Sequence, residues 1–479
     1  MRRLFTVLTS VFFSLSLAVH QTCAYTLQYT DISAAVRVKW PGNTIKIALS
    51  KSLTAPPSNI KQGSDVLGAV RRAMKRWSEA ANVTFIETSS DALNISPSGS
   101  GDRLSLITVA DTPENRAVFD SADRTGRTRI FYDTMTGAIT EADVVINPAA
   151  QFSTDGTRGT YDLEATFTHE LGHVLGLEHS HEAGAVMQPR QGINGLYEQA
   201  ATTARTLSDD DRAGARSLYG SAETFGAITG KVDETTGAPA MSTHVWAEEV
   251  KTGKVVAGNS SMPDGSFRIE GLPPGEYRLV AESDSVHDGA TDMASGVGLS
   301  ATAETYKTES HVAETDSQIS VAAGESVRQD IALEHTGTTL KPQVFGTNGH
   351  LSTIAVPVHP GGRYTIFVGG SGLDQVSGSG IAVTSPFIKV SAGSLMLQEG
   401  VNYEHPIISF DIEVSSSAQP GDYSIRLESK TGEVAYISGG LSVDSGTEAA
   451  DATINVEGSA AQATTIAITN GILGISSSR

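Results

Sequence analysis

Apolar residues in the first 220 positions follow two different periods. After Ser64 and Asp65, which can cap a helix, apolar side chains recur every three to four residues over 66–77, so an amphipathic helix is predicted there. Alternating or continuous apolar runs predict strands on both sides of that helix. These runs are 44–49, 82–86, 104–109 and 142–146. Strands mixed with long helices predict an α/β or α+β domain over residues 25–220.

The outer face of the predicted helix is basic. Arg71, Arg72, Lys75 and Arg76 lie between its apolar positions. Such a charged stripe is more often a solvated surface than a binding patch, so we expect these four side chains to face water.

After residue 220 the pattern changes to short β-prone runs broken by Gly, Pro, Ser and Asp. The runs are 228–232, 243–247, 266–269 and 277–280, and turn clusters stand at 263–265 and 273–275. This spacing is typical of a β-sandwich, which we place at residues 225–336. The stretch 283–317 is polar and acidic, so it is predicted to be an inserted loop, and 327–333 is predicted to be the closing strand.

The same pattern of short β-prone runs continues over residues 340–444 and predicts a second β-sandwich. Residues 445–479 are small and polar with little to pack, so they are predicted to be a low-complexity tail without assigned structure. The expected fold class is therefore multidomain, with an α/β or α+β domain followed by two all-β sandwich domains.

The beginning of the chain has the features of a secretory signal peptide. Two arginines precede the apolar run 4–19, and the small residues of 22–24 suit a cleavage site, so residues 1–24 are predicted to be removed. A membrane anchor is the alternative, and polar His20 and Gln21 disfavour it. No later stretch approaches the roughly 20 apolar residues that cross a bilayer, so the mature chain is expected to have no membrane span. We expect it outside the cytoplasm, as a secreted, surface or periplasmic protein.

Composition narrows the possible partners and metal sites. The 34 Lys and Arg stand against 54 Asp and Glu, and the resulting net charge of −20 repels nucleic acid. The single cysteine, Cys23, falls in the predicted signal peptide, which excludes a disulfide framework and a thiolate zinc site from the mature chain.

Residues 168–180 concentrate the candidate chemistry. On a helix, His169 and His173 are four residues apart, so both imidazoles project from one face and can bind one zinc ion. Glu170 lies beside the first ligand, where its carboxylate can act as general base on a zinc-activated water. Histidines that merely fill a core are the alternative, and their clustering speaks against it.

A third histidine completes this arrangement. Gly176 can end the helix and turn the chain, so that His179 returns as the third ligand. Three protein ligands leave one coordination position open, which is the catalytic arrangement of zinc rather than the structural one.

The extended HExxHxxGxxH pattern of 169–179, followed by 185–189, resembles a metzincin with its Met-turn. The resemblance implies that Met187 lies as an apolar floor beneath the ligands. Ser180, straight after the third histidine, is similar to the matrixins, as are the flanking stretches 70–85 and 207–220. The resemblance therefore implies an α+β metzincin catalytic domain, with a mixed sheet and long helices, ahead of the two all-β sandwich domains. It also implies that this domain holds one catalytic Zn²⁺ and cleaves protein or peptide substrates.

The chain also departs from the matrixin pattern. It has no cysteine switch ahead of the catalytic region, and no histidines upstream of His169 that could hold the family's second zinc, so we expect one zinc. Gln191 stands where matrix metalloproteases usually carry the Tyr of a wall beside the S1′ pocket. Structural Ca²⁺ is common in the family, and its ligands cannot be assigned in this sequence.

The two β regions resemble known modules. Residues 226–280 look like a carboxypeptidase regulatory-like domain, and residues 340–443 are more loosely similar to a bacterial immunoglobulin-like domain. Such modules serve as spacers or bind extracellular matrix and cell-surface ligands.

These observations predict a secreted zinc-dependent endopeptidase with Glu170 as general base. The alternative is a surface or matrix adhesion protein whose protease domain is inactive or only processes itself. Retention of Glu170 with all three ligands favours the active enzyme, because a site without activity has no physical need for that carboxylate.

Overall fold

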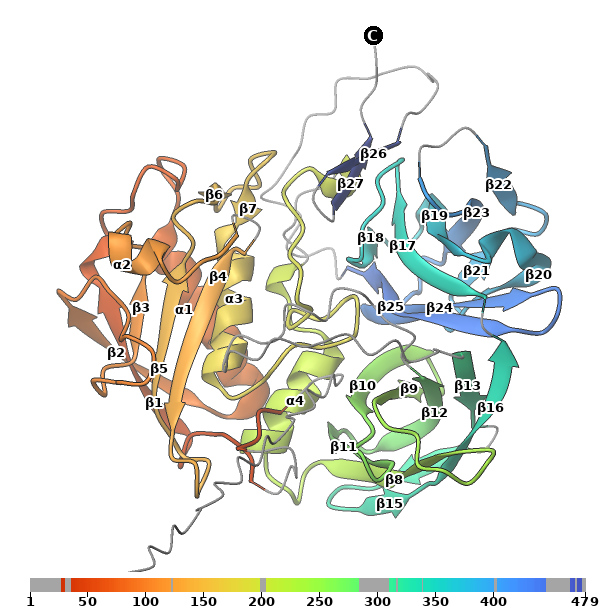
Figure 1. Cartoon of the computed structure of the whole chain (residues 1–479), viewed down its shortest axis with the longest axis horizontal. Coiled ribbons are helices and arrows are strands. Elements are labelled where there is room, and N and C mark those ends of the chain that lie inside the picture. Colours follow the sequence, from red (N-terminus) through yellow and green to blue (C-terminus); the bar gives the residue numbers. More distant parts are fainter. Residues whose placement is uncertain are drawn as a thin grey trace, which may run out of the picture.

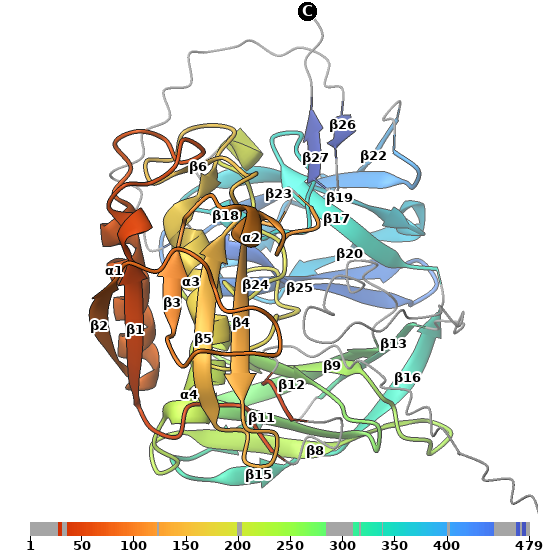
Figure 2. The same cartoon turned by 60° about the vertical axis from the view of Figure 1, so that its left-hand side comes forward.

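The computed structural model arranges the chain in three units (Figures 1 and 2). We call them the first unit (27–220), the second unit (226–337) and the third unit (341–443). The described residues are 27–30, 36–121, 124–198, 204–283, 310–315, 318–337, 339–399, 403–444, 466–469 and 472–475. The predicted signal peptide 1–24 and most of the predicted tail 445–479 lie outside them.

The main element of the first unit is a five-stranded mixed sheet. Its strands are β1 (Thr44–Ser50), β2 (Thr84–Ser90), β3 (Leu106–Thr108), β4 (Gly126–Tyr132) and β5 (Ile139–Ile146). Their order is β2-β1-β3-β5-β4, and all neighbours are parallel except β4, which runs antiparallel to β5 at one edge. The predicted α+β unit with a mixed sheet is thereby confirmed.

Helices and two short strands complete the first unit. They are α1 (Val66–Ala81), α2 (Pro113–Arg116), α3 (Leu163–Val174), α4 (Asp209–Tyr219), the 3-10 turns η1 (Lys51–Leu53) and η2 (Leu196–Glu198), β6 (Phe152–Ser153) and β7 (Tyr161–Asp162). Helix α1 begins after Asp65, whose carboxylate accepts a hydrogen bond from the Gly68 amide, and ends before Asn82 in the left-handed region with φ 55°. Helix α1 packs against α3, and α3 packs on β4.

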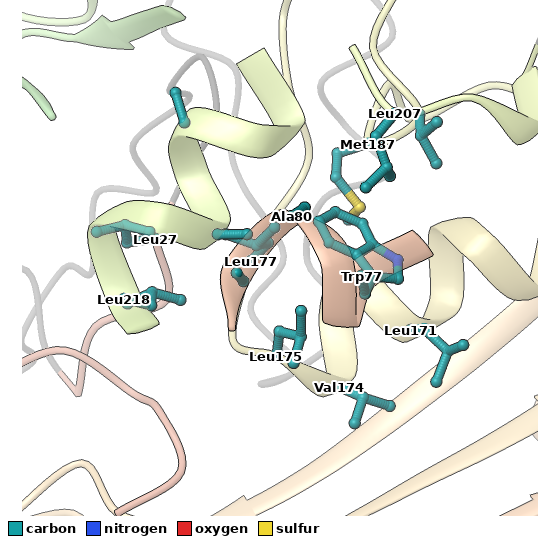
Figure 3. Close-up of a cluster of buried hydrophobic side chains, with 14 of the residues drawn as sticks. Leu27, Trp77, Ala80, Leu171, Val174, Leu175, Leu177, Met187, Leu207 and Leu218 are labelled. Carbon is teal, nitrogen blue, oxygen red and sulfur yellow. The ribbon is translucent and has the colours of Figure 1, made fainter. Parts of the chain in front are cut away.

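The core beneath α3 is built around Trp77. Its indole is fully buried and donates a hydrogen bond to the Thr168 carbonyl at 2.7 Å, so its polar atom is satisfied. Figure 3 shows Trp77 of α1 beside Met187, with Leu171 and Val174 of α3 nearby. Helix α3 is thus fixed from behind by a large aromatic side chain.

The basic face on α1 is solvated as predicted except at Arg76, whose side chain is 18% exposed. Arg71 pairs with Glu87 at the surface. Arg72 and Arg76, in contrast, reach the carboxylate of Glu164 at the start of α3, whose side chain is 1% exposed. A buried carboxylate needs such partners, and this one ties the two helices together.

The second unit is all β. Its strands are β8 (Gly226–Glu234), β9 (Thr243–Glu249), β10 (Lys254–Ser260), β11 (Ser266–Leu272), β12 (Gly275–Ser283), β13 (Ser310–Glu314), β14 (Ile319–Val321), β15 (Ser326–Arg328) and β16 (Ile331–Gly337). The loop prediction for 283–317 is wrong at its ends: Ser283 belongs to β12, and β13 pairs with β12 and β16. Residues 284–309 and 316–317 lie outside the described residues. The expected strand 327–333 is divided between β15 and β16.

The third unit is also all β. Its elements are β17 (Lys341–Thr347), β18 (Val356–Val358), β19 (Arg363–Ser371), η5 (Leu373–Gln375), β20 (Val376–Val383), β21 (Ile388–Val390), β22 (Met396–Gln398), β23 (Ile407–Val414), β24 (Gly421–Ser429) and β25 (Val434–Val443). The two β units were expected to be separate sandwiches. Instead β10 pairs antiparallel with β24, so one sheet of 13 strands runs through both.

A short hairpin of β26 (Ile466–Thr469) and β27 (Ile472–Ile475) lies within the predicted tail. Across the described part of the chain, every helix is too short or too polar to cross a bilayer.

Candidate metal centre and catalytic cleft

Helix α3 presents the first two candidate ligands. The Asp162 carboxylate accepts a hydrogen bond from the Ala165 amide and caps its start. The helix ends near Gly176, whose φ of 94° lies in the left-handed region. A Cβ at this position would lie 2.2 Å from the Val38 carbonyl oxygen, so only glycine fits the turn. This turn brings His179 back toward His169 and His173.

The three histidines face one another. Their ring centroids are 4.8 Å apart for His169 and His173, 5.2 Å for His169 and His179, and 4.9 Å for His173 and His179. One nitrogen from each lies within 4.8 Å of the other two. Among the described residues, this is the one group of three histidine or acidic side chains close enough to share a metal ion.

Backbone carbonyls fix which nitrogens are available to a metal. His169 Nδ1 lies 2.7 Å from the Val186 carbonyl oxygen, and His173 Nδ1 lies 2.8 Å from that of Leu177. A carbonyl can only accept, so each Nδ1 carries the hydrogen and each Nε2 keeps its lone pair. The two Nε2 atoms lie 3.1 Å apart. Two nitrogens bound to one tetrahedral zinc at about 2.0–2.1 Å would lie about 3.3 Å apart, so the residues fit this ion.

Burial keeps these imidazoles in the form that binds metal. Loss of hydration lowers the pKa of His169 and His179, and it lowers the pKa of His173 to about 3 with a contribution from the neighbouring His169. All three rings are therefore neutral near pH 7. A set of neutral imidazoles suits zinc and disfavours calcium, which prefers oxygen ligands.

Glu170 turns its carboxylate toward strand β4. The Thr128 hydroxyl donates a hydrogen bond to Glu170 Oε2 at 2.6 Å. Burial raises the pKa of Glu170 to about 7, although the Thr128 hydrogen bond acts in the opposite direction. A Cβ at Gly126 would lie 2.5 Å from Glu170 Oε1, so this glycine makes room for the carboxylate. The carboxylate is thus held in place between α3 and β4.

Met187 lies behind α3, fully buried. A Cβ at Gly172 would lie 2.2 Å from its sulfur, so the glycine at this position lets Met187 approach the helix. The turn that carries Met187 is held by Asp211 at the start of α4, whose carboxylate accepts from the Val186 and Met187 amides at 2.8 and 3.0 Å. The carboxylate of Asp211 also caps α4 together with Ser208.

An open cleft of about 900 Å³ contains the histidines and Glu170. Strand β4 and the segment 188–192 line it, and residues of the third unit complete the lining. Those residues are Ile354, Ala355 and Ser442. The Met187 turn and the cleft therefore lie where the first and third units meet.

Sequence reasoning missed several residues of this site. Thr128 lies in a strand that showed no chemical motif, and Ile354 is about 180 residues from the histidines along the chain, so neither had a signal. Asp211 did have a sequence signal, because Ser208 and Asp211 stand at the spacing of a capping box. Gln191, which stands at the expected wall position, does line the cleft, and it accepts a hydrogen bond from the Thr166 hydroxyl and donates one to the Asp162 carbonyl, both at 2.8 Å.

Comparisons with known proteins agree with two of the resemblances. Residues 39–220 match the matrixin family, and residues 227–334 match the carboxypeptidase regulatory-like domain. Both matches confirm the resemblances drawn from the sequence, whereas the immunoglobulin-like assignment of residues 340–444 stays a prediction.

Curated relatives match a part of the chain. A hatching enzyme of Paracentrotus lividus is 31% identical over 185 residues, covering 37% of this chain and 26% of the relative. Metalloendoproteinase 1-MMP of Arabidopsis thaliana is 30% identical over 207 residues, covering 41% and 48%. Matrix metalloproteinase-19 of Homo sapiens is 30% identical over 167 residues, covering 35% and 27%. The chain thus spans about a quarter to a half of the length of these relatives.

Proposed function

We propose that the matrixin domain of this chain, residues 39–220, is a zinc-dependent endopeptidase that cleaves proteins or peptides. One observation carries the proposal. The three imidazoles face one another, with the Nε2 atoms of His169 and His173 3.1 Å apart, and they share an open cleft with the carboxylate of Glu170. This combination of a metal-binding set with an adjacent carboxylate supports hydrolysis rather than structural metal binding.

The three histidines and Glu170 have different roles in amide hydrolysis. His169, His173 and His179 would hold the zinc ion through neutral imidazole nitrogens. Zinc bound there supplies a Lewis acid that polarises water and a substrate carbonyl. The Glu170 carboxylate takes the proton from the attacking water as the C–O bond forms, and returns it to the amine nitrogen as the C–N bond breaks.

Thr128 acts through Glu170 in this scheme. Its hydroxyl donates to one carboxylate oxygen at 2.6 Å, which leaves the other oxygen for the transferred proton. Because the carboxylate is already held in one orientation, it does not have to lose rotational freedom when it accepts the proton. We therefore regard Thr128 as a positioning residue.

Strand β4 offers a binding edge for an extended substrate. Among the described strands it pairs with β5 alone, and its residues from Gly126 to Tyr132 line the cleft. The unpaired edge of a sheet presents backbone N–H and C=O groups to which an extended peptide can add as a further strand. Backbone pairing of this kind supports the proposal of a peptide substrate, and it depends little on the side chains of that peptide.

We also propose that the enzyme acts outside the cytoplasm. The apolar run and the small residues of 1–24 support export followed by cleavage after Ala24. Sequencing of the amino terminus of protein recovered outside the cells should find Tyr25, whereas an intact Met1 would contradict the proposal.

The activity is tested by hydrolysis of a quenched peptide library. The full chain is compared with Glu170→Ala and with the control Glu79→Ala, whose side chain is 62% exposed on α1. We expect Glu170→Ala to lose at least about 100-fold in kcat and Glu79→Ala to lose nothing. Removal of zinc by a chelator should abolish cleavage, and added zinc should restore it.

Two results would contradict the proposal. A folded chain that holds one zinc and cleaves nothing would favour the binding-protein alternative. Cuts confined to the chain itself, with none in added peptides or denatured proteins, would favour self-processing.

A further inference from the structure

A segment of the first unit is buried in the third unit. Tyr197, in the chain that follows the cleft segment 188–192, has a side chain that is 2% exposed and packs in the core of the third unit. Its hydroxyl donates to the Ile354 carbonyl oxygen at 2.7 Å. A Cβ at Gly346 would lie 2.8 Å from the Tyr197 ring, so that glycine makes room for it. A side chain of the first unit thus forms part of the hydrophobic core of the third unit.

The backbone at this point is strained. Tyr197 and Glu198 have φ values of 56° and 59°, in the left-handed region that residues with a Cβ rarely adopt. The Asn348 side chain, from the third unit, donates to the Tyr197 carbonyl at 3.0 Å. Contacts with the third unit therefore offset the strain and decide the shape of this loop.

Further hydrogen bonds connect the third unit to the start of the cleft segment and to the chain just before it. Gln188 Nε2 donates to the Thr353 carbonyl at 3.3 Å. Closer to the metal centre, the Ala355 amide donates to the Ala183 carbonyl, and the Ala183 amide donates to the Ser438 carbonyl, both at 3.1 Å. These bonds fix the loop 348–355 of the third unit against the cleft.

Ile354 lies at the centre of these contacts. Its side chain is half-buried, packs against the core of the third unit and lines the cleft. A Cβ at Gly192 would lie 3.3 Å from Ile354 Cδ1, so the isoleucine occupies the space beside this glycine of the cleft segment. Nearby cleft residues such as Ala185, Pro189 and Ala355 are also apolar.

We propose that the third unit forms one wall of the substrate cleft, and that Ile354 sets the size of the apolar substrate side chain bound beside it. This inference rests on the proposed endopeptidase activity. A Cδ methyl group at the wall occupies volume that a larger substrate side chain needs, and it offers apolar contact to one that fits. The third unit is therefore part of the enzyme's specificity and is more than a spacer.

The test compares cleavage preferences of full-length variants. Ile354→Ala enlarges the cleft and Ile354→Phe fills it, so the two changes should move the preference in opposite directions. For paired peptides that differ only in one apolar side chain on one side of the scissile bond, we expect the ratio of kcat/KM for large over small to rise about tenfold in Ile354→Ala and to fall in Ile354→Phe.

Ile388→Ala is the matched control. Ile388 is 3% exposed, belongs to the same core of the third unit and does not line the cleft. It should lower stability without changing the ratio. If the wild type is active and both Ile354 variants keep its ratio, the inference is overturned while the proposed activity stands. An inactive wild type would instead refute the proposed activity.

A second measurement does not depend on variants at Ile354. Methyl NMR of the inactive Glu170→Ala chain is recorded while a peptide from the wild-type cleavage map is added. The Ile354 Cδ1 signal should shift, and the Ile388 signal should not. An unmoved Ile354 signal at saturating peptide would overturn the inference.

Discussion

Replacing Thr128 by valine removes one hydrogen bond and little else. Valine has the shape of threonine, so packing between β4 and α3 is kept, while the 2.6 Å contact with the Glu170 carboxylate is lost. A hydrogen bond to a charged group contributes about 1.5–3 kcal/mol. If Glu170 needs this bond only to hold its reactive orientation, kcat should fall by about 10- to 150-fold, since about 1.4 kcal/mol is tenfold in rate.

Steady-state kinetics on a single quenched peptide measures the effect. Thr128→Val should lower kcat with little change in KM, because the hydroxyl contacts Glu170. Thr128→Ser keeps the hydroxyl and should recover most of the rate. Equal rates in the wild type and Thr128→Val would refute the positioning role, and a serine variant as slow as the valine variant would assign the effect to packing.

Three further predictions concern stability and metal retention. Burial raises the pKa of Asp422 from 3.8 to about 7, so the stability gained from protonating this side chain is complete below about pH 4 and is lost as the pH rises through 7. In urea unfolding at pH 8, the free energy of unfolding of Asp422→Asn should therefore exceed that of the wild type by about 1–4 kcal/mol, and at pH 4 it should show no such gain. Asp211→Asn weakens the hold on the Met187 turn and should speed zinc loss to a chromogenic chelator about tenfold. Glu164→Ala removes the buried carboxylate that Arg72 and Arg76 contact, and denaturant unfolding should find it about 3 kcal/mol less stable; an unchanged midpoint would contradict this.

The sequence predicted the elements whose signals are local. Helix α1 and the strands beside it follow from apolar periodicity, and the histidine spacing predicts a shared metal because one helical turn aligns His169 with His173. Glycine at 176 indicated the turn toward His179, and the structure shows the φ that makes glycine necessary there.

The sequence could not predict what depends on contacts between units. Arg76 looked like a surface charge because its partner, Glu164, lies about 90 residues away. Strand β13 has little apolar content and gains its place by pairing with β12 and β16. The insertion of Tyr197 into the third unit has no local signal at all, because its burial depends on a unit that begins about 140 residues later.

Titration of zinc into the metal-free chain, with peptide cleavage as the readout, tests the central claim most directly. The account predicts no cleavage without metal, a linear rise in rate, and a break at one zinc per chain, because the histidine set holds one ion. Cleavage by the metal-free chain, or one tightly bound zinc with no cleavage, would contradict it.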